Sequence, residues 1–409
     1  MNSERTTYLS QGLDYYKATM SQSEFEHHPE AVVTFELKNR GSNLISEFVK
    51  PKELSDRLET LRRGWTPEEL AYLAGLQNQD GNAQFSEAYL DYLADSPLPQ
   101  VDVSLNGRGD IAAKTQGEWP LVTFWETVVM SELNEIYFDN KLKSEGSSIT
   151  ELYAEGDRRL DEKIAILKDR PDIKFADFGT RRRFSYGWHK HVVERLAQEL
   201  PENFIGTSNI YLAHTLGLPP IGTYAHELPM VYASLAEKEG RNPLEGHKEM
   251  LNDWEDTYRG DLSTALTDTF TSEFFFADFT KEQAEAWKGL RHDSGDPIEF
   301  GEQVIAFYEA YGVEPREKTI VFSDGLDLGT IILLADHFKD RIKIVFGWGT
   351  TLTNDLGVKT NNIVMKAVEV DGVTTVKLSD NIGKHTGDEE TIELYQGYVT
   401  QRVAEVVSV

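Results

Sequence analysis

Cysteine is absent from this chain of 409 residues. Its absence excludes disulfide bonds, thiol catalysis and metal sites built from thiolates. The ten histidines form no HExxH pattern and no comparable metal-ligand spacing. His189 and His191 lie close together in the sequence, and we expect both on an exposed helix.

Positive charge is scarce, because 41 lysine and arginine residues face 69 acidic residues and give a formal net charge of −28. This balance argues against a nucleic-acid or anionic-membrane partner. No apolar run approaches membrane-spanning length, and the first twenty residues lack a basic start followed by an apolar core. We therefore expect a cytoplasmic protein, and its length and 40% hydrophobic content predict two or three domains.

A recurring pattern of short apolar strand, polar or glycine-rich loop and amphipathic helix occupies the middle of the chain. The predicted strands are 173–178, 204–205, 218–221, 264–266, 289–290, 319–322 and 342–346. Strands that alternate with helices predict a parallel sheet, and seven such units favour an α/β barrel. Loops after barrel strands converge on one face, so their polar side chains should share a pocket. The alternative is that their Gly and Asp residues only make turns and caps.

Two of these loops carry candidate functional groups. His226 lies just beyond the segment 218–221, where rigid structure holds a side chain beside a cleft. The alternative role for this histidine is purely structural. Arg181, Arg182 and Arg183 follow a glycine, and their forked donors suit phosphate or carboxylate. A solvated arginine run on a helix is the competing interpretation.

Different elements flank the predicted barrel. We expect an N-terminal α+β accessory domain at 1–125, a barrel at 126–361 and C-terminal strands at 362–409 that join the accessory domain. The expected elements are a strand at 31–37, helix at 51–76, a strand pair at 101–105 and 111–114, a long helix at 122–143, and a hairpin of 363–370 with 373–378 around Asp371 and Gly372.

Four specific motifs and their order carry a family resemblance. They are DFGTRR at 177–182, GTYAHE at 222–227, RHDSGD at 291–296 and FGWGT at 346–350. With LDYYKATM at 13–20 and KLSD at 377–380, the chain resembles the nicotinate phosphoribosyltransferases along nearly its whole length. These enzymes make nicotinate mononucleotide from nicotinate and phosphoribosyl pyrophosphate with ATP hydrolysis. The resemblance implies a type II phosphoribosyltransferase: an irregular α/β barrel with an α+β accessory domain, Mg²⁺, ATP as co-substrate, and a homodimer with shared active sites.

The same resemblance implies roles for individual residues. His226 is similar to the histidine that ATP phosphorylates, and Asp268 to the carboxylate that orients it. The residues expected to contact nicotinate are Tyr16, Phe178, Thr223 and Arg291, with Tyr16 coming from the partner subunit. Those expected to bind phosphoribosyl pyrophosphate or ATP are Arg181, Arg182, Asp293, Asp324, Gly347, Gly349 and Thr350, and Asp293 is also expected to reach substrate-bound magnesium.

The chemistry of this reaction suits these residue types. Loss of pyrophosphate leaves an oxocarbenium-like centre, so catalysis rests on positioning and on stabilising separated charge. A neutral imidazole can accept a phosphoryl group, and a carboxylate on its other nitrogen supports the cation that forms. Backbone amides of Gly347 and Gly349 can approach a phosphate closely. Magnesium prefers oxygen ligands and substrate phosphates.

Three alternatives stay open. A nicotinamide-specific relative carries an aspartate where this chain has Ser208, and an aspartate would repel a carboxylate, so Ser208 favours nicotinate. A quinolinate-using enzyme needs more cationic groups for two carboxylates. A non-catalytic phosphosugar-binding barrel is the third alternative, because a fold alone does not establish activity. His226 beside the pocket motifs argues against it.

Overall fold

The computed structural model describes residues 7–407, which divide into two compact units. The first unit contains the chain up to residue 25, residues 34–222 and residues 348–366. The second contains residues 26–33, 223–347 and the chain from residue 367 onward. Both units are therefore assembled from separated stretches of sequence. The predicted domain boundaries at 125/126 and 361/362 stay a prediction.

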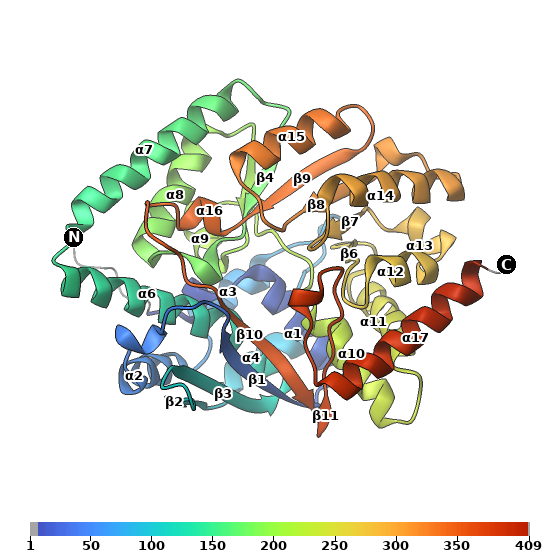
Figure 1. Ribbon diagram of the computed structural model, residues 1–409, viewed down its shortest axis with the longest axis horizontal. Helices are drawn as coiled ribbons and strands as arrows, with labels where there is room; N and C mark the ends of the chain where they lie inside the picture. The colour runs from blue at the N-terminus through green and yellow to red at the C-terminus, as the bar shows by residue number, and fades with distance from the viewer. Residues whose placement is uncertain (1–6, 408–409) are drawn as a thin grey trace. The chain divides into compact units, whose positions relative to one another are not determined.

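The first unit combines helices with two sets of strands (Figure 1). Its helices are α1 (Tyr15–His27), α2 (Pro51–Leu61), α3 (Pro67–Gly75), α4 (Glu87–Asp95), α5 (Trp119–Val122), α6 (Trp125–Glu145), α7 (Ile149–Lys168), α8 (Tyr186–Glu199), α9 (Ile210–Leu216) and α16 (Thr350–Thr353). Its strands are most of β1 (Val32–Asn39), β2 (Val101–Leu105), β3 (Ile111–Glu118), β4 (Phe175–Asp177) and β5 (Phe204–Thr207).

These elements confirm most of the local predictions for this unit. The predicted pair β2 and β3 is antiparallel, with Val101 opposite Thr115, and β4 and β5 are parallel. The predicted helix at 51–76 is two helices, because Gly64 adopts a positive φ of 78° and Thr66 caps α3 through a reciprocal bond pair with Glu69. The predicted long helix is α6, and every residue from 125 to 138 is buried.

The second unit is built around parallel strands. Its strands are β6 (Thr264–Leu266), β7 (Gly289–His292), β8 (Thr319–Phe322), nearly all of β9 (Lys343–Trp348), the second half of β10 (Ile363–Val370) and β11 (Val373–Thr374). Its helices are α10 (Glu227–Lys238), α11 (Pro243–Tyr258), α12 (Ser272–Asp278), α13 (Lys281–Ala286), α14 (Pro297–Tyr311), α15 (Leu328–Phe338) and α17 (Glu389–Val407). Short 3₁₀ helices in the two units are Leu9–Gly12, Ile45–Glu47, Thr180–Arg182, Pro315–Glu317 and Ile382–Lys384.

Strands β6, β7, β8 and β9 lie side by side in chain order and pair in parallel. In this register Leu266 is opposite Arg291, and His292 is opposite Phe322. Helices α14 and α15 pack against each other beside these strands (Figure 1). The loops after β6, β7 and β8 therefore emerge at the same edge of the sheet.

Six of the seven strands predicted for the barrel are present as β4 to β9. The seventh, at 218–221, is wrong, because Pro220 forms only an isolated bridge with Thr207. Pro219 and Pro220 have no N–H groups to donate to a strand ladder, which explains the failure. None of the helices between residues 7 and 407 combines the length and apolar composition of a membrane-spanning helix.

The predicted hairpin after residue 363 is present. Asp371 and Gly372 both have positive φ, 49° and 86°, as a two-residue hairpin turn requires. Its second strand ends at Thr374 instead of 378. The reason is that the N–H groups of Leu378 and Ser379 donate to the carbonyl of Thr269, at 2.9 and 3.3 Å.

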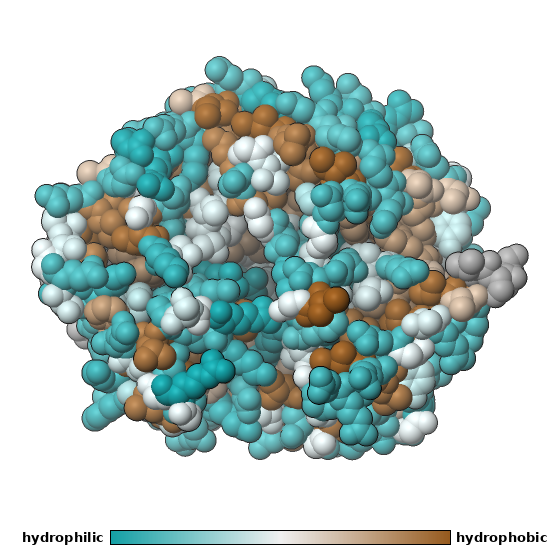
Figure 2. Space-filling view, in the orientation of Figure 1, coloured by the Kyte–Doolittle hydropathy of each residue, from teal (hydrophilic) through white to brown (hydrophobic). Residues whose placement is uncertain are grey.

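Helix α17 completes an apolar cluster in the second unit, and Figure 1 shows it in red beside α11 and α12. The cluster contains Ala233, Leu244, Phe270, Phe274, Val376, Leu378, Tyr395 and Val399. Tyr395 and Val399 come from α17, and the Tyr395 hydroxyl also donates to Glu237 at 3.0 Å. The face drawn in Figure 2 is largely hydrophilic, with apolar residues in separate small patches.

Candidate functional site

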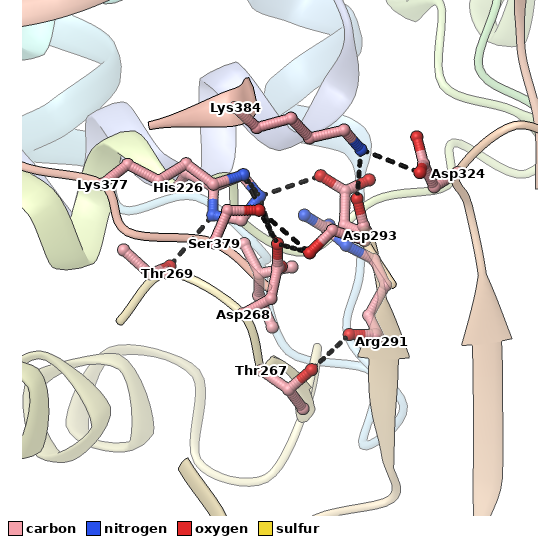
Figure 3. Close-up of polar contacts among 12 residues, drawn as sticks. His226, Thr267, Asp268, Thr269, Arg291, Asp293, Asp324, Lys377, Ser379 and Lys384 are labelled. Atoms are coloured by element: carbon pink, nitrogen blue, oxygen red, sulfur yellow. Dashed lines mark hydrogen bonds and ion pairs between the residues drawn. The ribbon is translucent and has the colours of Figure 1, made fainter. Parts of the chain in front are cut away.

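His226 is the residue before α10, and its imidazole lies among the loops that follow β6 and β7 (Figure 3). Its Nδ1 atom is 3.0 Å from the Thr269 hydroxyl. Its Nε2 atom is 2.8 Å from a carboxylate oxygen of Asp293 and 3.5 Å from one of Asp268. The register of β6 against β7 explains this meeting, because it places the two carboxylate-bearing loops side by side.

Lys377 is the third group at Nε2, with its Nζ atom 2.8 Å from that nitrogen and 3.4 Å from Asp268. An ammonium group only donates, so Nε2 accepts from Lys377 when it carries no proton and donates to Asp293 when it carries one. The Thr269 hydroxyl can donate or accept, so it suits Nδ1 in both cases. The site can therefore hold the imidazole proton on either ring nitrogen.

The charges around His226 favour a neutral imidazole between ionised carboxylates. Burial and the Lys377 ammonium lower the pKa of His226, and this outweighs the opposite influence of Asp268 and Asp293. Burial would raise the pKa of Asp293, but the hydrogen bond and charge of His226 hold it well below its usual range. Burial opposes ionisation of Asp268 too, yet His226 and Lys377 lower its pKa. A neutral imidazole has the lone pair that a nucleophile needs.

Asp268 is held firmly, and its side chain is only 1% exposed. The hydroxyls of Ser294 and Ser379 donate to its Oδ2 atom at 2.6 and 3.1 Å. The Ser379 hydroxyl oxygen also lies 2.9 Å from that of Ser294, within hydrogen-bond distance. Figure 3 shows Asp268 and Ser379 close to the imidazole, and the carboxylate cannot turn away without breaking its bonds to the two hydroxyls.

Only part of the Arg291 guanidinium group is hydrogen-bonded within residues 7–407. Its Nη1 atom donates to the carbonyl of Tyr224 at 2.8 Å, and the Thr267 hydroxyl donates to its backbone carbonyl at 3.0 Å. Its Nε atom is buried and has no hydrogen-bond partner within residues 7–407. A buried donor of this kind is costly unless something accepts from it, so the geometry suits an anionic ligand.

A second charged pair, Lys384 with Asp324, lies on the other side of Asp293. Ser323 donates to the Oδ1 atom of Asp293 at 3.1 Å. Lys384 donates to the Asp293 carbonyl and pairs with Asp324, both at 2.8 Å. Asp324 therefore belongs to the same constellation as Asp293, as Figure 3 shows.

The ligand atoms of His226, Asp268 and Asp293 lie within 4.8 Å of one another, close enough to surround a cation. However, the Lys377 ammonium already lies 2.8 Å from the His226 Nε2 atom and 3.4 Å from Asp268. A second positive charge between these three groups would be repelled. The Asp293 carboxylate has the oxygen ligands that magnesium prefers, whereas Asp324 is already paired with the Lys384 ammonium at 2.8 Å.

The first unit holds the remaining predicted residues near the ends of β4 and β5. Phe178 and Arg181 follow β4, and Arg181 pairs with Glu126 at 3.4 Å. Arg183 is fully buried and donates to the Gln11 carbonyl, so the solvated-helix interpretation is wrong for this residue.

Tyr16 is 6% exposed and packs against Gly222 of its own chain, where an added Cβ would lie 3.0 Å from the Tyr16 nitrogen. The Tyr15 N–H donates to the Ser208 carbonyl at 2.6 Å, and the Ser208 hydroxyl donates to Asp14 at 2.6 Å. Ser208 thus has a carboxylate beside it already, supplied by the N-terminal segment.

The predicted residues are therefore divided between the units. The second unit contains His226, Thr223, Asp268, Arg291, Asp293, Asp324 and Gly347, and the first contains Tyr16, Phe178, Arg181, Arg182, Gly349 and Thr350. Sequence analysis missed Thr269, Lys377, Lys384, Ser294, Ser323 and Ser379 as parts of the site. Two motifs could have indicated some of them, because Ser294 lies within RHDSGD, and Lys377 and Ser379 lie within KLSD.

His189 corrects a further expectation. Its helix α8 is present, but its side chain is fully buried and bonds to Asp177 at 2.7 Å. The His191 side chain is 40% exposed and pairs with Asp157 at 2.6 Å. Only His191 therefore faces solvent as expected.

Comparison with known proteins agrees with the motifs. The model of the nicotinate phosphoribosyltransferase (NAPRTase) family matches residues 173–400, and the model of its N-terminal domain matches residues 13–134. The chain is 37% identical to a nicotinate phosphoribosyltransferase of Xanthomonas euvesicatoria, over 91% of this chain and 92% of that protein. It is 38% identical to one of Chromobacterium violaceum, over 93% and 94% of the two chains.

Solved structures are similar over the whole chain. The nicotinate phosphoribosyltransferase of Porphyromonas gingivalis gives a TM-score of 0.86 at 31% identity, covering 96% of this chain and 99% of that one. A putative nicotinate phosphoribosyltransferase of Saccharomyces cerevisiae gives 0.82 at 26% identity, covering 98% and 100%. These likenesses confirm the predicted fold class, the α/β fold of the type II phosphoribosyltransferases.

Proposed function

The chain belongs to the nicotinate phosphoribosyltransferase family, and we propose that it couples the synthesis of nicotinate mononucleotide to ATP hydrolysis through a phosphorylated His226. The full reaction converts nicotinate, phosphoribosyl pyrophosphate, ATP and water to nicotinate mononucleotide, pyrophosphate, ADP and phosphate. The nicotinate phosphoribosyltransferase activity rests on identity of 37 to 38% across more than 90% of the chain. The protein is thus an enzyme of NAD salvage.

The phosphorylated histidine is supported by the surroundings of His226. Its lowered pKa favours a neutral imidazole, and the two carboxylates at Nε2 can stabilise the positive charge that develops when the ring is phosphorylated. Thr269 faces the other nitrogen and can accept or donate there. Asp268 is the predicted orienting residue, and Asp293 makes the shorter contact with the ring.

Recognition of nicotinate is proposed to depend on Arg291, whose buried Nε donor suits the carboxylate of the pyridine. Thr223 lies three residues before His226, and Tyr16 and Phe178 are the proposed ring contacts. An aromatic side chain facing a pyridine adds about 1 kcal/mol beyond area burial. A nicotinamide enzyme would have no ligand charge to match Arg291.

Recognition of the phosphate groups is proposed to depend on Arg181, Arg182, Gly347, Gly349 and Thr350. Asp293 is the carboxylate proposed to reach magnesium through the substrate, and Asp324 is proposed to contact the substrate. Magnesium, when bound, neutralises pyrophosphate oxygens and so favours departure of that group.

We also propose a cytoplasmic homodimer with shared active sites. The contacts of Tyr16 with Gly222 and of Tyr15 with Ser208 are made within one chain, so Tyr16 already has a place in its own subunit. Sharing would need Tyr16 to reach a second chain as well as, or instead of, its own.

Product identification tests the activity directly. Nicotinate, nicotinamide and quinolinate are supplied together with phosphoribosyl pyrophosphate and ATP, and the mononucleotides are separated and identified. We expect nicotinate mononucleotide as the main product. A dominant nicotinamide product would contradict the roles given to Arg291 and Ser208, and no mononucleotide at all would contradict the enzymatic function.

A further inference from the structure

Asp177 is the last residue of β4 and is fully buried where the loops after β4 and β5 begin. Its side chain accepts three hydrogen bonds: from the Gly179 N–H at 2.8 Å, the Thr207 hydroxyl at 2.6 Å and His189 Nε2 at 2.7 Å. Its backbone carbonyl accepts from the Ser208 N–H at 2.7 Å. One residue therefore fixes the first turn of both loops.

The loops that Asp177 joins are the ones that carry proposed ligand contacts. Phe178 and the arginines at 181 and 182 follow β4 directly, and their turn continues with the Arg182 N–H donating to the Gly179 carbonyl at 3.3 Å. Thr207 links Asp177 to the loop after β5, because its hydroxyl also accepts from the Asn209 N–H at 3.0 Å. A shift of Asp177 would therefore displace the turn under Phe178 and the turn at Ser208 together.

His189 is the ionisable partner of this buried carboxylate. Both side chains are 0% exposed, and a buried carboxylate is costly without a charged or strongly donating partner. The Nδ1 atom of His189 is buried and has no hydrogen-bond partner within residues 7–407. A phenylalanine ring would fill the same space without an unpaired nitrogen, so packing alone does not account for a histidine here. The hydrogen bond from His189 Nε2 to the buried Asp177 carboxylate accounts for the histidine.

We propose that His189 is a positioning residue for ligand binding, acting through Asp177 on the loop that carries Phe178, Arg181 and Arg182. Its role rests on the proposed function of those loop residues. His189 contacts Asp177, not the ligand, so its loss should weaken binding of nicotinate and phosphoribosyl pyrophosphate. Because Arg181 and Arg182 are also proposed to bind ATP, His226 phosphorylation should need a higher ATP concentration. At saturating ATP it should be intact, because the groups that contact the His226 ring come from other loops.

The test uses matched substitutions. His189→Phe removes the donor and keeps a ring, His189→Gln keeps an N–H donor, and Thr207→Val removes another bond to Asp177 while keeping the side-chain shape. His191→Phe is the control, because His191 forms the same kind of histidine–aspartate pair on the same helix but is 40% exposed.

Hydrogen exchange in the protein without substrate measures positioning directly. We expect His189→Phe to speed exchange in residues 178–182 and 207–209 beyond any general increase, with a smaller effect for His189→Gln and none for His191→Phe. The KM values for nicotinate and phosphoribosyl pyrophosphate should rise about tenfold or more, as expected for loss of a hydrogen bond to a charged group. Phosphate incorporation from γ-labelled ATP, measured at saturating ATP, should stay within about twofold, because the side chains around the His226 ring are not bonded to Asp177 or His189.

Unchanged loop exchange and unchanged KM values in His189→Phe would overturn the proposal. So would a fall in phosphate incorporation that parallels the rise in KM, because a general loss of structure gives that pattern. If His189→Phe does not fold, Thr207→Val decides the question by exchange in residues 178–182 alone, because this substitution also removes the acceptor of the Asn209 N–H. If the wild-type protein forms no nicotinate mononucleotide, the proposed function fails, while the exchange result still tests the positioning.

Discussion

Replacing Arg291 by leucine tests the most specific claim about substrate choice. Arg291 is oriented by its bond to the Tyr224 carbonyl and keeps a buried Nε donor for a ligand. Loss of one partner of a desolvated charge pair costs about 2 to 5 kcal/mol. At about 1.4 kcal/mol for each factor of ten, the Kd for nicotinate should rise from about 30-fold to several thousand-fold.

Calorimetric titration of each ligand separately is the appropriate assay. Binding of phosphoribosyl pyrophosphate to Arg291→Leu should change by about twofold or less, since this residue is assigned to the pyridine side. Arg291→Lys keeps the charge but loses the forked donor, so it should recover only part of the affinity for nicotinate. Nicotinamide, which lacks the carboxylate, should be affected much less. Equal weakening of nicotinate and phosphoribosyl pyrophosphate would refute the assignment and move Arg291 to the phosphate side.

Three further substitutions test the histidine and the subunit arrangement. His226→Asn should abolish acid-labile phosphate incorporation and stimulation by ATP while the circular dichroism spectrum stays native; stable phosphate on this variant would contradict the acceptor role. Lys377→Met removes a charge that lowers the pKa of His226, so an NMR titration should show that pKa rising. In the folded protein the pKa of His226 lies below the ordinary histidine value, so its contribution to stability is lost as pH falls through the ordinary histidine range. Urea unfolding of Lys377→Met should show a smaller loss of stability over the same pH range. Mixing inactive Tyr16→Ala and His226→Asn subunits should restore partial activity if sites are shared, whereas confirmed heterodimers without activity would place Tyr16 in the site of its own chain.

The parallel strands could be predicted because each is a short apolar run followed by a polar or glycine-rich loop. The hairpin was also predictable, since Asp371 and Gly372 tolerate the positive φ angles of its turn. The segment at 218–221 failed although it is apolar, because two prolines remove the donors that a strand needs. Local composition thus predicted strands well wherever backbone N–H groups were available.

The site was predicted from motifs, and what they missed depends on long-range arrangement. Lys377 reaches His226 only because the chain leaves β10 after Thr375 and turns to bond with Thr269 through Leu378 and Ser379. No local pattern around Lys377 indicates that turn. His189 was expected on an exposed helix together with His191, but it is buried against Asp177, twelve positions earlier.

Helix α17 gives the chain a specific order of events during synthesis. The second unit needs residues 26–33 near the beginning of the chain and Tyr395 and Val399 near its end. Translation delivers these segments far apart in time, so the apolar cluster around Phe270 stays open until the last helix has left the ribosome. A nascent chain that stalls before α17 would expose this cluster and be a substrate for chaperones. Emergence of α17, and not emergence of the catalytic motifs, is therefore the event that allows the second unit to close its core.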